Sequence, residues 1–289
     1  MPYKELSAGS AQLKKLRGLS QSRMRTRFSQ QRVEGVQAVR ELVLCEPRLV
    51  RDIYTTRAVL AQRPEIVRAI DEHNMYVHIG DDDLLAKVAP HAQGIVAVAN
   101  LPELANLEYI FRQAPLVVCC VQANDPGNVG TIIRTADACG AGGVVLGEGS
   151  VDPYSSKVIR SAAGSTFHLP VRESSVSETV AEAKRHGFQV ILADAGGEVS
   201  LGDLDNGAAR RNAEASPHVS LAAPTLWLVG NEAHGFSEEH KNLADVIVSI
   251  PMWGKTESLN LAVATGVCLY ASANALFSPY SLRNESLAL

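Results

Sequence analysis

Apolar runs of strand length alternate with helical stretches along most of the chain. The runs of the C-terminal half are predicted strands, and the first of them is a continuous apolar run, which is typical of a strand buried on both faces. They fall at residues 116–122, 144–146, 167–171, 190–193, 226–229 and 246–250. Helical patterns separate them, at 129–139, 154–162, 176–186 and, at the end, 259–277. This alternation predicts an α/β fold with a parallel sheet covered by helices on both sides.

The N-terminal part shows a second, smaller series of elements. The pattern predicts a helix from about Ser10 to Ser20, an amphipathic stretch over 33–44, strands at 53–56, 76–79 and 95–99, and helices over 65–73 and 84–88. Pro64 at a first helical turn and Asp81 as an N-cap support the two helices. We therefore expect a basic extension over 1–30, a small α/β domain over 31–100, a linker over 101–114 that is helical over 104–112, and a larger domain over 115–289.

Between Asp194 and Ala223 the pattern fails, and Gly, Asn, Ser and Pro residues predict a long polar loop. Loops of this length in a compact domain are usually functional or disordered.

Composition limits the class of protein. Of 289 residues, 46% are hydrophobic and 20% charged, which predicts a soluble globular protein. No apolar run approaches the roughly 18–20 residues that cross a bilayer, and the N-terminus lacks a signal-peptide core. We expect a cytoplasmic protein with no membrane partner.

Charge is unevenly distributed. The formal net charge is −4, yet the first 32 residues are strongly basic. Besides Lys4, the cations are Lys14, Lys15, Arg17, Arg23, Arg25, Arg27 and Arg32. They indicate either a phosphate-binding patch or a solvated tail.

The five cysteines, Cys45, Cys119, Cys120, Cys139 and Cys268, form no Cys-x-x-Cys pair and no Cys/His cluster with zinc spacing. They are expected to be reduced, buried, small hydrophobic residues, and no metal site is predicted.

Polar side chains follow three of the predicted strands. Asn128 and Arg134 stand in a turn and the helix after it, where a helix N-terminus and a guanidinium suit a phosphate. A cap and a surface arginine would account for the same residues. Glu232 follows a strand directly, and it is either a site carboxylate or a surface turn residue. His234 is expected to be non-catalytic.

The third block contains Ser258 and Asn260. Ser258 is expected to cap a helix that begins at Leu259. Asn260, a poor helix former just inside that start, is then free to bind a polar ligand or orient the site.

Together these blocks resemble the three motifs of the SpoU (TrmH-like) family of RNA ribose 2′-O-methyltransferases, in order and in spacing. The first runs from Asn124 through Arg134 to Ala136, the second from Leu228 to Gly235, and the third from Ile250 to Val263. The similarity covers residues 116–277. The N-terminal block, with Phe28 and Val33-Glu34-Gly35, resembles the ribosomal-L30-like RNA-binding domain common in that family.

The resemblance implies a C-terminal domain of the SPOUT type with a deep trefoil knot, and a homodimer with its site at the subunit interface. The reaction would be S-adenosylmethionine-dependent methylation of an RNA ribose 2′-hydroxyl. The implied catalytic residues are Arg134, Asn128, Glu232, Ser258 and Asn260, and the implied cofactor-binding residues are Gly230, Ile250, Leu259, Leu228 and Asn260. Arg134 is implied to be essential, although a guanidinium with a pKa above about 12 is an awkward base.

The implied RNA contacts are Arg23, Arg25, Arg27, Arg32 and Arg40. Ribosomal RNA, in particular 23S rRNA, is favoured, and the layout is closest to ribosomal and thiostrepton-resistance enzymes. A tRNA methyltransferase and a non-catalytic RNA-binding protein are the alternatives. A nicotinamide-dependent enzyme is disfavoured because the dinucleotide-binding fingerprint is missing.

Overall fold

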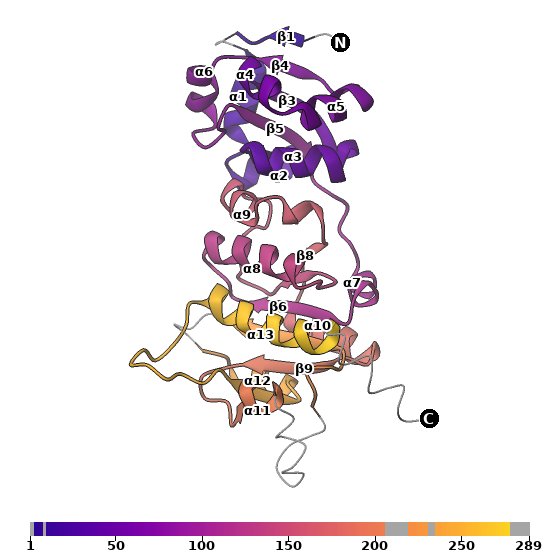
Figure 1. Ribbon diagram of the computed structural model, residues 1–289, viewed down its shortest axis with the longest axis vertical. Coiled ribbons are helices and arrows are strands. Elements are labelled where there is room, and N and C mark those ends of the chain that lie inside the picture. Colours follow the sequence, from indigo (N-terminus) through magenta and orange to yellow (C-terminus); the bar gives the residue numbers. More distant parts are fainter. Residues whose placement is uncertain (1–2, 8–9, 206–218, 231–234, 278–289) are drawn as a thin grey trace. The chain divides into compact units, whose positions relative to one another are not determined.

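The computed structural model describes residues 3–7, 10–205, 219–230 and 235–277. It divides into two compact units (Figure 1). The first contains residues 1–103 together with 152–168, and the second contains residues 104–151 and 169–289. Sequence reasoning placed 152–168 in the C-terminal domain. The segment belongs to the first unit because Ile159 and Phe167 enter its apolar core beside Val39 and Ile66.

The first unit is built on a five-stranded mixed sheet in the order β1-β4-β3-β5-β2. Its strands are β1 (Tyr3–Glu5), β2 (Gln30–Glu34), β3 (Val50–Thr55), β4 (Val77–Ile79) and β5 (Ile95–Asn100). Its helices are α1 (Ala11–Gly18), α2 (Ser22–Phe28), α3 (Val36–Cys45), α4 (Arg57–Gln62), α5 (Pro64–Glu72), α6 (Asp82–Val88) and α9 (Ser156–Ala162), with 3-10 turns η1 (Pro47–Leu49) and η2 (Ser165–Phe167).

Helices cover both faces of this sheet. Leu42 of α3 and Ile70 of α5 join one core cluster, while Leu16 of α1 and Leu85 of α6 join another. The amphipathic stretch over 33–44 was predicted without its strand. Residues 30–34 form β2, antiparallel to β5, and all of them are buried despite their polar sequence.

The second unit contains a seven-stranded sheet, parallel throughout, in the order β10-β12-β9-β11-β6-β7-β8. The strands are β6 (Leu116–Val121), β7 (Val144–Leu146), β8 (Val171–Glu173), β9 (Gln189–Ala193), β10 (Val199–Ser200), β11 (Thr225–Gly230) and β12 (Val246–Ser249). The helices are α7 (Leu107–Gln113), α8 (Pro126–Ala138), α10 (Val176–Arg185), α11 (Leu201–Asp205), α12 (Glu238–Leu243) and α13 (Leu261–Phe277).

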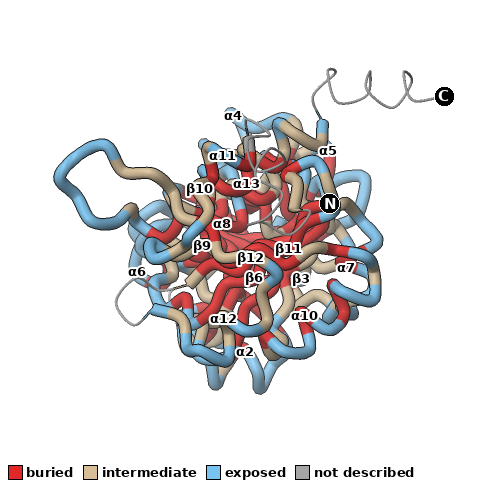
Figure 2. Tube along the Cα trace, turned by 90° about the horizontal axis from the view of Figure 1, so that it is seen from below, coloured by how far each residue is buried: buried red, intermediate tan, exposed pale blue. Residues whose placement is uncertain are grey.

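Neighbouring residues of the central strands point to opposite layers. Leu226 and Leu228 of β11 pack in the cluster that contains Phe111 of α7 and Val180 of α10. Trp227, between them, donates a hydrogen bond from Nε1 to Ser272 Oγ of α13 at 2.9 Å. The central strands β6, β9 and β11 are accordingly buried (Figure 2). The predicted parallel sheet with two covered faces is confirmed; the trefoil knot stays a prediction.

Two local expectations are wrong. Residues 167–171 are not one strand: η2 ends at Phe167, and β8 begins only at Val171, after Pro170, which has no N–H to donate to a ladder. The segment 194–223 is not all loop, because β10 and α11 form within it; residues 206–218 lie outside the described part. None of the helices in the described ranges combines the length and apolar character that crossing a bilayer requires.

Candidate functional site

A cavity of about 260 Å³ lies where β9, β11 and β12 end. These strands are neighbours and parallel, so their carboxyl ends share one edge of the sheet. The lining comes from the ends of the strands and from the segment before α13. It comprises Ala193, Asp194, Ala195, Val229, Gly230, Gly235, Phe236, Val248, Ile250, Met252, Glu257, Ser258, Leu259, Leu261 and Ala264.

The structure thus brings together four of the predicted site residues around one space, namely Gly230, Ile250, Ser258 and Leu259. Leu228 does not line it. That side chain is fully buried in the core on the side of α7 and α10.

Gly230 is required at the end of β11 by its neighbour Phe236. A Cβ atom built on Gly230 would stand 2.7 Å from Phe236 Cζ, closer than van der Waals contact allows. The missing side chain lets the aromatic ring lie against the strand end and form one wall of the cavity. Phe236 is a wall residue that sequence reasoning did not single out.

Asn260 connects the cavity segment to two helices. Its Oδ1 accepts hydrogen bonds from the backbone N–H of Ala262 at 3.0 Å and of Val263 at 3.4 Å, so Asn260 caps α13. Its Nδ2 donates to Asn128 Oδ1 at 3.0 Å. The predicted capping by Ser258 is wrong, because the helix begins at Leu261 and Ser258 lies too far before it.

The N-cap of the helix in the first motif block is Asp125 and not Asn128. Asp125 precedes α8, and its Oδ1 accepts from the backbone N–H of Asn128 at 2.8 Å. Because Asp125 performs the capping, the Asn128 side chain is left to meet Asn260. The N-termini of α8 and α13 are therefore joined by a side-chain amide pair beside the cavity.

Arg134 lies in α8, two turns after Asn128, and is exposed. It forms no ion pair with any residue that the structure describes. Glu232 and His234 lie outside the described residues.

Asp194, in the turn after Ala193, is a cavity carboxylate that was not among the predicted site residues. Its backbone N–H donates to Val248 O at 3.0 Å, and its Oδ1 accepts from Gly196 N–H at 2.8 Å. The turn is thereby pinned to β12 and presents Asp194 at the strand edge. The sequence contains an indication of its role, because Asp194 directly follows an apolar strand, and the same feature made Glu232 a candidate site residue.

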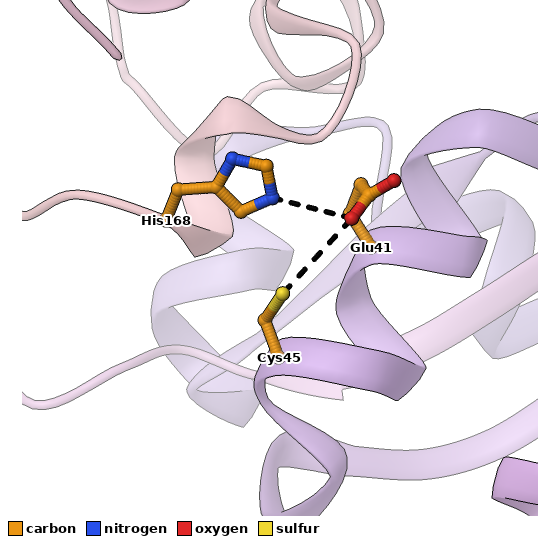
Figure 3. Close-up of side chains that lie close together, drawn as sticks. All are labelled: Glu41, Cys45 and His168. Atoms are coloured by element: carbon orange, nitrogen blue, oxygen red, sulfur yellow. Dashed lines mark hydrogen bonds and ion pairs between the residues drawn. The ribbon is translucent and has the colours of Figure 1, made fainter. Parts of the chain in front are cut away.

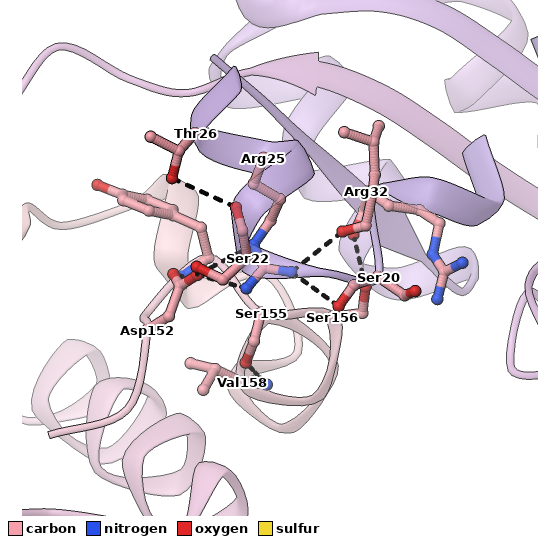
Figure 4. Close-up of polar contacts among 11 residues, drawn as sticks. Ser20, Ser22, Arg25, Thr26, Arg32, Asp152, Ser155, Ser156 and Val158 are labelled. Atoms are coloured by element: carbon pink, nitrogen blue, oxygen red, sulfur yellow. Dashed lines mark hydrogen bonds and ion pairs between the residues drawn. The ribbon is translucent and has the colours of Figure 1, made fainter. Parts of the chain in front are cut away.

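Two of the predicted RNA-contacting arginines are structural. Arg25 is 4% exposed and pairs with Asp152, with Nε 3.0 Å from Oδ2, while its Nη1 donates to the carbonyls of Leu19 and Ser20 (Figure 4). Arg32 is 6% exposed, pairs with Glu34 at 2.6 Å and donates to Val88 O at 2.7 Å. Both guanidiniums are already used by the fold, so the expectation that they contact RNA is wrong.

Other basic residues of the first unit do face outward. Arg23 and Arg27 are exposed on α2. Lys15 Nζ lies 4.9 Å from the ring centroid of Phe28, and the Arg27 guanidinium lies 5.5 Å from it. We call Lys15, Arg23, Arg27 and Phe28 the basic-aromatic patch. Arg40 is half-exposed but pairs with Glu41 and Glu65.

Four cysteines are buried, as predicted. Burial raises the pKa of the Cys120 and Cys268 thiols to about 12, and that of Cys119 well above its usual range. These thiols stay protonated at neutral pH. Cys45 is the exception: it ends α3 and is exposed, so its predicted burial is wrong.

The comparisons with known proteins agree with this layout. The model of the SpoU rRNA Methylase family matches residues 115–270. The chain belongs to this family. The SpoU match spans the whole cavity lining and all of α8, includes α13 as far as residue 270, and leaves most of the first unit outside it.

Relatives of known function match over most of their length. The chain is 32% identical over 268 residues to the 23S rRNA (guanosine(2553)-2′-O)-methyltransferase RlmP of Bacillus subtilis, covering 91% of this chain and 96% of that protein. A solved SpoU methyltransferase, AviRb from Streptomyces viridochromogenes in complex with AdoMet, is 30% identical with a TM-score of 0.76, over 92% of this chain and 98% of that one. An AdoMet-bound rRNA methyltransferase from Sinorhizobium meliloti is 25% identical with a TM-score of 0.79, over 96% and 99%.

Proposed function

We propose that this protein is an S-adenosylmethionine-dependent RNA ribose 2′-O-methyltransferase that acts on 23S rRNA in the cytoplasm. One observation carries the proposal: the strand-edge cavity opens beside the Asn128–Asn260 pair, which joins the N-termini of α8 and α13. Relatives named as 23S rRNA 2′-O-methyltransferases support the choice of reaction and favour rRNA over tRNA.

The cavity suits the cofactor that the family uses. Val229, Ile250, Met252 and Leu259 provide apolar walls for a flat adenine ring, and strand-end backbone groups offer hydrogen bonds. Asp194 adds a carboxylate that suits ribose hydroxyls or a cationic group. When bound, S-adenosylmethionine supplies an activated methyl group. Gly230, Ile250, Leu259 and Asn260 are the residues we assign to holding it, and Leu228 supports them from the core.

The residues of the first and third motif blocks would orient the RNA. Asn128 and Asn260 are fixed by each other, and Arg134 presents a planar guanidinium that can bind a phosphate through two parallel hydrogen bonds. Holding the ribose hydroxyl in line with the methyl group supplies most of what such a reaction needs. We assign Glu232 to the same pocket, where a carboxylate would hold Arg134 or accept the hydroxyl proton. Ser258 shapes the rim.

The basic-aromatic patch is our candidate for binding the RNA backbone. Cations close to an aromatic ring suit both phosphates and unstacked bases. Arg40 is a weaker candidate because two carboxylates already neutralise it.

We propose that the active form is a homodimer. An apolar groove of about 850 Å³ runs between α11, the segment at Ile250 and α13. Large apolar side chains are exposed along it, with Tyr270 70%, Val263 53% and Trp253 92% exposed. A groove of this kind next to the cavity fits a second copy of the chain.

Two measurements test the proposed function. Calorimetry of the full chain with S-adenosylmethionine is expected to give saturable binding. Mass mapping of rRNA from cells with and without the gene is expected to show one 2′-O-methyl mark that depends on it. Cofactor binding with an unchanged rRNA map would move the substrate to tRNA, and no cofactor binding would contradict the enzyme assignment.

A further inference from the structure

Three side chains with metal-binding atoms meet in the first unit, and none of them belongs to the three methyltransferase motifs. Glu41 and Cys45 stand four residues apart on α3, so they share one face of that helix. His168 follows η2 and faces them (Figure 3). His168 Nε2 lies 3.3 Å from Glu41 Oε2, and Cys45 Sγ lies 4.0 Å from the same oxygen. All three ligand atoms lie within 4.8 Å of one another.

The Glu41 carboxylate is held so that its two oxygens have different surroundings. Oε1 accepts from Gln37 Nε2 at 2.8 Å and pairs with the Arg40 guanidinium. Oε2 is the oxygen that faces both His168 and Cys45. Glu41 is 9% exposed, so the carboxylate is buried and fixed. Hydrogen bonds to the far oxygen of a ligating carboxylate are the usual support around a bound metal.

The backbone approaches closely at the same point. Gly164, with a φ of +106°, lies against Glu41, and a Cβ atom built there would overlap Cβ and Cγ of the glutamate. Only glycine allows that approach and that backbone angle without strain. The turn that carries His168 is therefore set directly against α3.

We propose that Glu41, Cys45 and His168 form a Zn²⁺ site. Thiolate, imidazole and carboxylate are all zinc ligands, with bond lengths of about 2.0–2.3 Å that put ligand atoms roughly 3–4 Å apart in a tetrahedron. The two observed separations from the Glu41 oxygen, 3.3 Å and 4.0 Å, need little contraction. A thiolate ligand disfavours Mg²⁺ and Ca²⁺, which prefer oxygen. Water would take the fourth position.

An ion can reach the site from solvent. Cys45 and His168 are exposed, and Cys45 also lines an open cavity with Glu46, Pro47, Arg48 and His73. Binding would release the thiol proton to solvent and join Cys45 to Zn²⁺ as a thiolate. The bound ion would link His168, in the turn after α9, to Glu41 and Cys45 on α3, and would thereby cross-link two segments of the first unit. The inference does not depend on methyl transfer.

Cobalt substitution in the untagged full-length protein tests the site. Co²⁺ added to chelator-treated protein is expected to give one equivalent of binding, with a sulfur-to-cobalt charge-transfer band and the intense visible bands of tetrahedral coordination. Zn²⁺ should displace it, and Mg²⁺ should not. Cys45→Ser is expected to remove the charge-transfer band, and His168→Gln and Glu41→Gln to weaken Zn²⁺ binding at least tenfold. His91→Gln, the same exchange at an exposed histidine of the same unit, is the control and should bind as the wild type does.

Stability gives a second readout that does not rely on spectra. Zn²⁺ at one fixed concentration, a few times the wild-type Kd, should raise the Tm of the wild type and of His91→Gln, and should raise the Tm of Cys45→Ser and His168→Gln much less. Circular dichroism would verify that these two variants fold. Absence of a charge-transfer band in the wild type, or a folded Cys45→Ser variant that binds Zn²⁺ with unchanged affinity, would overturn the proposal.

Discussion

Asn260 shows how one side chain can serve stability and the site together. Its carbonyl oxygen caps α13, and its amide group donates to Asn128 on α8. Sequence reasoning chose this residue because asparagine is a poor helix former, and the structure gives the reason: it lies just outside the helix.

Two different substitutions of Asn260 separate these tasks. An aspartate at this position would still cap α13 but cannot donate to Asn128, and it brings a carboxylate against Asn128 Oδ1. We expect Asn260→Asp to keep a near-normal Tm and lose at least about tenfold in methyl transfer, a loss of about 1.4 kcal/mol. Asn260→Ala should also lose about 1 kcal/mol of stability with the cap. Thermal denaturation measures the stability of the two variants, and single-turnover methylation measures their rate of methyl transfer. Full activity of the aspartate variant would contradict the orienting role of Asn260.

Arg134 is expected to act on RNA without touching the cofactor cavity. Arg134→Ala should lower methyl transfer by at least about 100-fold, the loss typical for one stabilising donor at a reacting centre. Arg134→Lys should also be poor, because an ammonium group lacks the planar fork. S-adenosylmethionine affinity by calorimetry should not change. The matched control is Arg112→Ala, an exposed arginine of the same unit that pairs with Glu108; near-normal turnover by the lysine variant would show that charge alone suffices.

Gly230 and Phe236 form a pair that can be tested by complementary changes. Gly230→Ala should push the Phe236 ring, 2.7 Å from the added methyl group, into the cavity and weaken cofactor binding. Shortening the partner in Gly230→Ala/Phe236→Leu should restore part of the affinity. Calorimetry on the single and double variants gives the coupling. Additive losses would mean that the two residues act independently.

At the scale of elements, the segment 152–168 is the main departure from expectation. It leaves the parallel sheet after β7, packs α9 and η2 into the first unit, and returns to form β8. Polar contacts hold it as well: Arg25 pairs with Asp152, and Ser156 Oγ donates to Arg32 O at 3.3 Å (Figure 4). The sequence does not predict that this segment packs in the first unit, because α9 has the same pattern as a helix that connects two parallel strands.

The Arg25–Asp152 pair should therefore matter for folding. Asp152 is only partly buried, so we expect Arg25→Ala to lower the free energy of unfolding by about 2 kcal/mol, less than the 3–5 kcal/mol typical of a fully buried pair. Arg27→Ala, on the exposed side of the same helix, should change it by less than about 0.5 kcal/mol. Urea denaturation of the two variants and of Arg25→Ala/Asp152→Ala measures this. Equal stability of both single variants would contradict the structural role of Arg25.

At the scale of the molecule, the net charge of −4 conceals a local basic surface. Replacing Lys15, Arg23 and Arg27 together by alanine should weaken RNA binding and reduce its salt dependence by about 0.7–0.9 log–log units for each phosphate that is no longer bound. Cofactor affinity should stay the same. Filter binding over a salt series measures the slope; an unchanged slope would identify these residues as a solvated surface that RNA does not touch.

Assembly can be tested by mixing two kinds of impaired subunit. If Arg134 completes the partner's site, each site contains Arg134 of one chain and Asn260 of the other. In a mixed dimer of Arg134→Ala and Asn260→Ala chains, one site then contains both substitutions and the other site contains neither. Subunit exchange should then restore activity towards half of wild type per mixed dimer. Native mass spectrometry confirms the mixing. Verified mixed dimers without activity would place Arg134 and the cavity of one chain in the same site.

The parallel sheet and the three strand-end blocks could be predicted from the amino-acid sequence. Continuous apolar runs can be buried only between helical layers, and turn residues after such strands must lie at one edge of the sheet. Local chemistry also predicted Asp81 as a helix cap, and the burial predicted for all five cysteines is confirmed for four of them.

Which polar groups meet could not be predicted in this way, because it depends on the packing of the folded chain. Arg25 and Arg23 are indistinguishable in a basic stretch, yet one is buried against Asp152 and the other faces solvent. Glu41 meets His168, which lies 127 positions further along the chain, a separation that no motif spacing describes. The physical reason is the same in both cases: periodicity fixes the direction of a side chain within its own element, whereas its partner depends on how distant segments pack.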